Sequence, residues 1–83
     1  MTNGTILSTH QIKAARALLD WSQEDLASAT DLSIATIRKL ELGYISPRSA
    51  TTTGIRKAFE DAGIEFLDSE GVRRRQEDIS TFR

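Results

Sequence analysis

Apolar residues recur every three or four positions along residues 8–62, a period typical of amphipathic helices. Serines stand just before several of these stretches, where a serine side chain accepts hydrogen bonds from the free N–H groups of a helix start. The first of them, Ser8, is followed three residues later by Gln11, an arrangement that resembles a capping box. The pattern predicts four helices, over residues 9–19, 22–30, 33–42 and 49–61.

The hydrophobic period shortens to two residues after Gly63. Ile64, Phe66 and Val72 alternate with polar residues around a polar, glycine-containing turn, which is typical of two short strands. Residues 76–83 are compatible with a tail, a strand or a short helix.

The chain has 83 residues, which is enough for one domain only. We expect a flexible N-terminus over residues 1–7, a helical domain over residues 8–62, and a strand-containing segment over residues 63–83 that mediates dimerisation. The predicted fold class is mainly α: a compact bundle of four to five helices with a short C-terminal β-strand or hairpin.

The composition excludes most catalytic and metal-binding chemistry. The chain has no cysteine and one histidine, His10, so thiolate or imidazole metal clusters and cysteine catalysis are excluded. The sequence contains no nucleophile–base pair and no phosphate-binding loop, so we expect neither an enzyme nor a bound cofactor or small-molecule ligand. No apolar run approaches the ~18 residues of a membrane span, which predicts a soluble cytoplasmic protein.

Positive and negative charges are segregated along the chain, although its net charge is only −1. Residues 33–57 hold five basic side chains against one acidic side chain, whereas residues 58–71 hold five acidic side chains and no basic one. The net charge hides this basic block at residues 33–57, and the function of the protein has to account for it.

The helices predicted over residues 22–30 and 33–42 are separated by about two residues, so they must cross steeply, as in a helix-turn-helix. The second helix of such a unit presents its outer face to a partner, and a helix fits the ~12 Å wide major groove of DNA. With Ile37 and Leu40 turned inward, the outward positions are Ser33, Ala35, Thr36, Arg38 and Lys39.

The segments WSQEDLA (residues 21–27) and LSIATIRKLELG (residues 32–43), followed by Pro47, resemble the XRE or Cro/C1-type family of DNA-binding repressors. The resemblance covers about residues 9–62. It implies a lambda-repressor-like domain that binds double-stranded operator DNA as a symmetric homodimer. Two positions depart from the family pattern: Asp31 stands where the turn often has glycine, and Ile34 stands where glutamine is common.

The resemblance also implies roles for individual residues. Gln23, at the start of the first helix of the unit, is expected to hold a phosphate. Ile34, Ala35 and Thr36 occupy the base-contacting tip, where Ala35 and the Thr36 methyl group can meet thymine methyl groups. The full set of expected DNA contacts is Gln23, Ser33, Ile34, Ala35, Thr36, Arg38, Lys39, Tyr44 and Arg48.

Within that set, Arg38 and Lys39 are candidates for guanine contacts, or for phosphate contacts if they turn aside. Tyr44 and Arg48 follow in the next loop at positions that contact the DNA backbone. Outside the set, the resemblance pairs Arg16 with Glu41 as a buried structural link between the first and third helices, and from its size and type we expect Trp21 to pack the first helix against the second.

The dimer interface is expected on the C-terminal segment, because a short strand with open edges pairs readily with its two-fold mate. Its expected residues are Ile64, Phe66, Leu67 and Val72. The role of the three arginines at residues 73–75 stays open between a dimer or flanking-DNA contact and a solubilising tail.

Two functions remain once an enzyme is set aside. The first is a sequence-specific transcriptional regulator, a repressor able to act at its own promoter, of the kind used by bacteria, phages and mobile elements. It would work in the cytoplasm, associated with the nucleoid. The alternative is a protein-interaction module such as an antitoxin or antiactivator. The small and basic residues at positions 33–39 favour the first, because an interaction module is expected to lose them.

Overall fold

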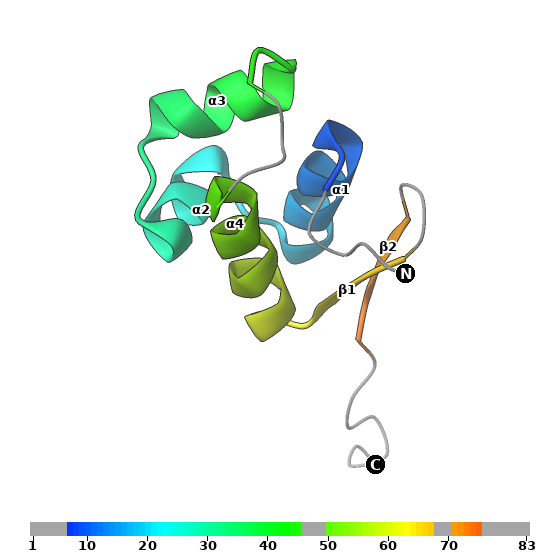
Figure 1. The fold of residues 1–83 in the computed structure, drawn as a ribbon. Coiled ribbons are helices and arrows are strands. Elements are labelled where there is room, and N and C mark those ends of the chain that lie inside the picture. Colours follow the sequence, from blue (N-terminus) through cyan, green and yellow to red (C-terminus); the bar gives the residue numbers. More distant parts are fainter. Residues whose placement is uncertain (1–6, 46–49, 68–70, 76–83) are drawn as a thin grey trace, which may run out of the picture.

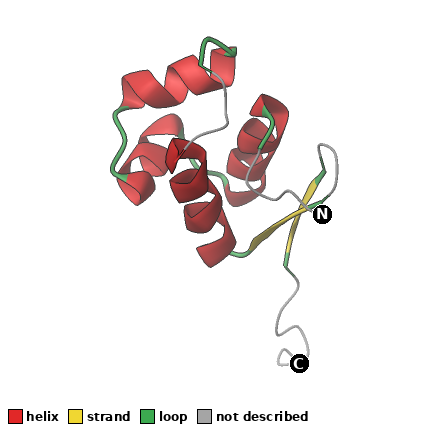
Figure 2. Cartoon of the chain, in the orientation of Figure 1, coloured by secondary structure: helices red, strands yellow, loops and turns green. Residues whose placement is uncertain are grey.

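The structure is a computed structural model that describes residues 7–45, 50–67 and 71–75. Its elements are α1 (Thr9–Leu19), α2 (Gln23–Thr30), α3 (Ile34–Leu42), α4 (Ala50–Asp61), β1 (Ile64–Phe66) and β2 (Val72–Arg74). The helices form one body, with α3 at one end and the two strands at the other (Figures 1 and 2). This confirms the mainly helical fold with a C-terminal hairpin, and it places the expected tail at residues 76–83 outside the described residues.

The helix starts lie where the serines predict them. Ser8 accepts a hydrogen bond from the Gln11 N–H (3.0 Å), and the Gln11 side chain accepts one from the Ser8 N–H (3.1 Å), which completes a capping box. Ser22 and Asp25 form the same reciprocal pair at the start of α2. Ser33 caps α3 through the Thr36 N–H. Local side-chain chemistry therefore fixes the N-termini of the first three helices.

The chain reverses direction at residues with a left-handed backbone. Asp20 follows α1 with φ +59°, and Asp31 follows α2 with φ +66°. Short polar side chains tolerate this region better than other non-glycine residues, and Asp31 here replaces the glycine common in the family turn. Gly43, with φ +84°, ends α3 and donates its N–H to the Leu40 carbonyl (3.2 Å).

One hydrophobic core joins all four helices and the first strand. Leu7, expected to be part of a flexible N-terminus, is fully buried in it. Trp21, expected to pack α1 against α2, packs against this core and also stacks on Phe59 of α4, with ring centroids 5.6 Å apart. The buried apolar residues are Leu7, Ile12, Ala15, Leu26, Ala27, Ile37, Leu40, Ile55, Phe59 and Ile64.

The two strands form an antiparallel hairpin, with Glu65 opposite Arg73 and Phe66 opposite Val72. The side chains of Phe66 and Val72 face the helices and pack against the core. Glu65 and Arg73 form an ion pair of 2.7 Å between neighbouring strands. Because both of these charged side chains are exposed, the pair adds little stability, but it gives the outer face of the hairpin one acid beside one base.

Gln11 holds the hairpin against α1. Its side chain is almost fully buried, and its Nε2 donates to the carbonyl oxygens of Leu67 (3.2 Å) and Gly71 (3.0 Å), the residues on either side of the hairpin turn. Its Oε1 is occupied by the capping box at Ser8. The amide group therefore has hydrogen-bond partners at both ends, which is what a buried polar side chain requires.

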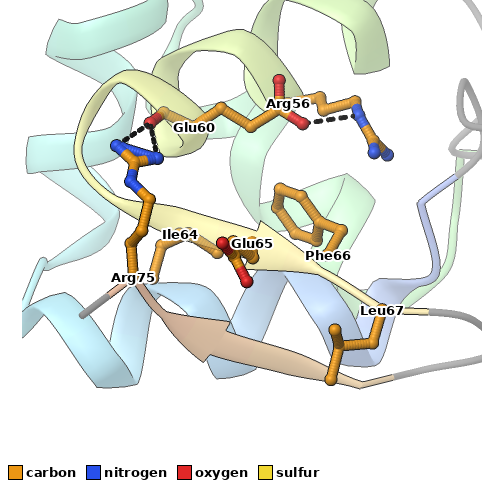
Figure 3. A pocket seen from close by; sticks show the side chains of 7 residues that line it. All are labelled: Arg56, Glu60, Ile64, Glu65, Phe66, Leu67 and Arg75. Atoms are coloured by element: carbon orange, nitrogen blue, oxygen red, sulfur yellow. Dashed lines mark hydrogen bonds and ion pairs between the residues drawn. The ribbon is translucent and has the colours of Figure 1, made fainter. Parts of the chain in front are cut away.

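The last two arginines of the run face helix ends. Arg74 donates to the carbonyl of Leu18 in the last turn of α1 (3.4 Å), and Arg75 donates to the carbonyl of Glu60 in the last turn of α4 (3.5 Å; Figure 3). Cations are favourable near helix C-termini, where carbonyl groups lack helical partners. The arginine run therefore ties the hairpin to two helices, a role different from those expected from the sequence.

Candidate nucleic-acid interface

The helices α2 and α3 form the predicted helix-turn-helix. Residues 31–33 connect them, and the two helices pack against each other. Leu26 and Ala27 of α2 and Ile37 and Leu40 of α3 are buried between them and the rest of the domain. Because α3 lies at one end of the molecule (Figure 1), the face of α3 that points away from Ile37 and Leu40 is open to a partner.

The open face of α3 carries small, hydroxyl and basic side chains. Ser33, Ala35, Arg38 and Lys39 are exposed, and Thr36 is half-buried. The Ser33 hydroxyl donates to Thr36 Oγ1 (3.1 Å), which orients both hydroxyl groups. The structure thus brings together five of the side chains that the sequence placed at the DNA.

Ile34 is the largest apolar side chain among the predicted contacts of α3. It is half-buried and packs against the core, next to Leu32 and Ala27. The spacing of Ile34, Ile37 and Leu40 puts all three on one helix face, and that face is turned inward. Ile34 therefore takes part in the packing of the helix-turn-helix; because it is half-buried, as Thr36 is, the base contact that the resemblance implies for it stays a prediction.

The two cations of α3 differ from most other basic residues in lacking a carboxylate partner. Within residues 7–45, 50–67 and 71–75, Arg38 and Lys39 form no ion pair. By contrast, Arg56 binds Glu60 at 3.0 Å, and the basic groups at 16, 57 and 73 bind carboxylates at 2.7–3.3 Å. The face of α3 therefore presents positive charge that no carboxylate in the described part of the chain pairs with.

A partly buried ionic network supports α3 on the side that faces the rest of the domain. Arg16 of α1 forms a forked contact with Glu41, its Nε donating to Oε2 and its Nη2 to Oε1, each at 2.7 Å. Gln23, the first residue of α2, donates from Nε2 to the same Oε1 (3.1 Å), and Arg16 also donates to the Trp21 carbonyl (2.9 Å). Glu41 is 5% exposed at its side chain. One carboxylate thus fixes the relative positions of α1, α2 and α3.

The ionisation of Glu41 is set by opposing influences. Burial raises the pKa of its carboxyl, but hydrogen bonds from Arg16 and Gln23 and the positive charges of Arg16 and Lys13 outweigh burial and hold the pKa below its usual range. The hydrogen bond to Glu41 in turn raises the pKa of Arg16, against a smaller opposing effect of burial. The pair is therefore fully charged at neutral pH.

The contact between Gln23 and Glu41 was not apparent from the sequence. The resemblance assigned Gln23 to a phosphate and Glu41 to Arg16, and nothing in the spacing linked the two. The bond uses one of the two hydrogens of the Gln23 amide. The other remains available to an acceptor, and the amide is held in one orientation at the N-terminus of α2.

Apolar side chains are exposed at the last residue of α3 and just after it. Tyr44 is 76% exposed and Leu42 is 65% exposed, so Tyr44 is accessible for the backbone contact predicted for it. Arg48, the other predicted contact of the loop after α3, lies outside the described residues.

The predicted dimer residues gather on the hairpin but mostly face their own core. Ile64 is fully buried, so its side chain belongs to the core of one chain and is not available to a partner. Phe66 and Val72 pack on the same core, and the guanidinium group of Arg56 lies 5.0 Å above the Phe66 ring (Figure 3). Leu67, at 43%, is the exposed member of the set.

The described residues contain no helix long and apolar enough to cross a membrane. The same part of the chain contains no cluster of three or more acidic or histidine side chains that could hold a metal ion.

Comparison with known proteins identifies the family. A helix-turn-helix family model of the Cro/C1 type matches residues 12–59, which is more than half of the chain and includes all of α2 and α3. A search of the curated proteins finds no match. The match coincides with the two helices, the turn and the exposed basic face described above, and the chain therefore belongs to the Cro/C1-type (XRE) helix-turn-helix family of DNA-binding regulators.

Proposed function

We propose that this protein is a sequence-specific transcriptional repressor that binds an inverted-repeat operator as a homodimer and acts at its own promoter. The observation that carries this proposal is the pair of exposed, unneutralised cations, Arg38 and Lys39, on the open face of α3. A protein-interaction module would be expected to lose this charge and the row of small side chains beside it.

The chemistry of the α3 face matches the edges of base pairs in the major groove. An arginine can donate two hydrogen bonds to O6 and N7 of one guanine, and a hydroxyl group can either donate or accept. Ala35 and the methyl group of Thr36 supply short apolar contacts for thymine methyl groups. Small side chains near the N-terminus of α3, with basic ones further along, let the helix enter the groove with its N-terminal end first.

Residues around α3 provide contacts that are independent of sequence. Gln23 is oriented by Glu41 at the start of α2, where backbone N–H groups and the helix dipole favour a phosphate. Tyr44 is exposed just beyond the end of α3. Such contacts fix the position of the recognition helix on the duplex, while the α3 side chains distinguish between sequences.

The proposed function is tested by binding to DNA from the region upstream of the protein's own gene. Fluorescence anisotropy at two salt concentrations, with scrambled DNA of equal length as control, measures affinity and preference together. We expect a preference of ~10³-fold or more and two protomers per site. Equal, weak binding to both duplexes would contradict the proposal, and capture of a protein ligand would then favour an antitoxin or antiactivator.

The homodimer is proposed to form through the outer face of the hairpin. A two-fold axis brings a surface against a copy of itself, so the surface must be self-complementary. The outer face supplies the exposed Leu67 next to the paired charges of Glu65 and Arg73, and the acid of one copy can face the base of the other. Binding of one α3 helix in each of two successive major grooves requires the two helices to lie ~34–36 Å apart, one turn of duplex.

Leu67→Glu is expected to convert the dimer into a folded monomer. Leu67 is outside the buried core, so the free energy of unfolding should change by less than about 0.5 kcal/mol, while two like charges would meet at the two-fold axis. Sedimentation velocity measures the state of association, and circular dichroism confirms the fold. Phe66→Asp is less informative because Phe66 packs against Phe59 in its own chain (ring centroids 6.1 Å apart).

The matched control is Leu42→Glu, which places the same charge on another exposed leucine, at the end of α3. It should leave the dimer intact. If Leu42→Glu dissociates the dimer and Leu67→Glu does not, the interface lies beside the recognition helix, and the assignment to the hairpin is wrong.

A further inference from the structure

Helix α1 carries a lysine beside the recognition helix to which none of the roles above applies. On either side of it, Thr9 Oγ1 donates to the carbonyl of Leu40 (3.3 Å) and Arg16 binds Glu41 (2.7 Å). Lys13 lies four residues after Thr9 and three before Arg16, so the three side chains share one face of α1. That face adjoins the C-terminal turn of α3.

Lys13 projects into solvent from this face. It is exposed and forms no ion pair with any residue in the described part of the chain. Its charge still acts on α3: against the effect of burial, it adds to the hydrogen bonds that keep the pKa of Glu41 low. Lys13 is therefore close enough for its charge to act on Glu41 although the two are not bonded. It lies beside the edge of α3.

The dimensions of DNA determine which part of the duplex lies next to Lys13 when α3 is in the major groove. The major groove is ~12 Å wide and a helix with its side chains is ~10–12 Å across, so α3 fills the groove. A helix packed ~8–10 Å from the axis of α3 therefore lies over a wall of the groove. That wall is the sugar–phosphate backbone, and α1 is one of the helices that pack against α3.

We propose that Lys13 is a phosphate contact that anchors the recognition helix on the strand also approached by Gln23. The two residues share a side because both adjoin Glu41, Gln23 through a hydrogen bond of 3.1 Å and Lys13 through its position between Thr9 and Arg16. The inference rests on the proposed DNA-binding function. On this inference, α1 contributes to the affinity for DNA but not to the preference for one DNA sequence over another.

The test compares Lys13→Gln with wild-type protein on two duplexes: DNA from upstream of the gene, and a scrambled duplex of the same length. Fluorescence anisotropy over a range of NaCl concentrations gives the slope of log K against log[salt]. Loss of one phosphate contact should reduce that slope by ~0.9 and weaken binding about fivefold to tenfold near 0.1 M salt. Both duplexes should be affected equally, so the ratio of their affinities stays constant.

Two further variants make the result specific to this position. Lys57→Gln removes an exposed lysine that is already paired with Asp61 on α4 (3.3 Å), and it should leave the slope unchanged. Lys13→Arg keeps the charge and should restore the wild-type slope. Thermal unfolding of each variant confirms that all are folded at the assay temperature.

The outcomes separate this inference from the function on which it rests. Wild-type binding together with an unchanged slope for Lys13→Gln would overturn the phosphate contact and leave the DNA-binding proposal intact. A loss confined to the upstream duplex would also overturn it, because a phosphate contact is independent of sequence. Failure of the wild-type protein to bind either duplex would overturn both.

Discussion

Glu41→Gln is expected to lower the free energy of unfolding by roughly 2–3 kcal/mol. The substitution keeps the shape of the side chain but removes the charge that Arg16 contacts in two places and leaves a partly buried guanidinium group unpaired. Breaking a fully buried pair costs ~3–5 kcal/mol, and the Arg16 side chain is 21% exposed, which reduces the cost. Because a domain of this size has a total stability of ~4–12 kcal/mol, urea unfolding should detect the change easily.

The same substitution should change how stability depends on pH. The pKa of Glu41 is lower in the folded chain than its ordinary value of ~4.3, so its contribution is present above that value and is lost as the pH falls through the lowered pKa. We therefore expect the difference between wild type and Glu41→Gln to be constant from pH 7 to about 5 and to shrink toward pH 3.

Glu24→Gln is the control for this pH dependence, because Glu24 is exposed on α2 and forms no ion pair with the residues that the structure describes. Its stability curve should run close to that of the wild type. If the difference between wild type and Glu41→Gln is the same at pH 3 and pH 7, the carboxylate is not the source of the stabilisation and the network contributes through packing alone.

The helix starts could be predicted from the sequence because they depend on neighbours along the chain. Ser8, Ser22 and Ser33 each cap a helix through an N–H three residues away, and hydrogen bonds of that range need no tertiary structure. The left-handed conformation of Asp31 is local in the same way. These signals specify α2, α3 and the turn between them, and therefore the helix-turn-helix itself.

Contacts between distant elements could not be predicted in this way. The period of α1 shows that one face is buried but not that Gln11 reaches the hairpin turn, nor that Leu7 completes the core. The position of Trp21 says nothing about Phe59, nearly forty residues away in the sequence. Such pairs depend on how the elements are arranged in space, which a single sequence does not encode as a pattern.

Ile34 and Ile64 show what the hydrophobic period predicts by itself. Ile34 is three residues before Ile37, and the period alone predicts that both pack toward the core, while the base contact that the resemblance implies for Ile34 stays a prediction. Ile64 shares the inward face of the hairpin with Phe66 and Val72, because side chains alternate across a strand. The prediction that Ile64 contacts a dimer partner did not take this alternation into account.

Arg38→Ala is expected to reduce the preference for upstream over scrambled DNA by about 5- to 150-fold, which corresponds to the ~1–3 kcal/mol that one bidentate contact to guanine contributes to discrimination. The side chain is exposed and has no carboxylate partner in the described part of the chain. Its removal should therefore change the free energy of unfolding by less than about 0.5 kcal/mol. The ratio of the two affinities, measured by fluorescence anisotropy at one salt concentration, is the relevant quantity.

Arg38→Lys separates the charge of the side chain from its shape. Lysine keeps the positive charge but lacks the planar fork that donates two parallel hydrogen bonds to one guanine. If Arg38 reads a base, Arg38→Lys should retain the wild-type salt slope and still lose much of the preference. If instead Arg38→Ala weakens binding to both duplexes equally and Arg38→Lys restores it, Arg38 is a phosphate contact, and base recognition on α3 falls to Lys39 and to the small side chains at the N-terminal end of the helix.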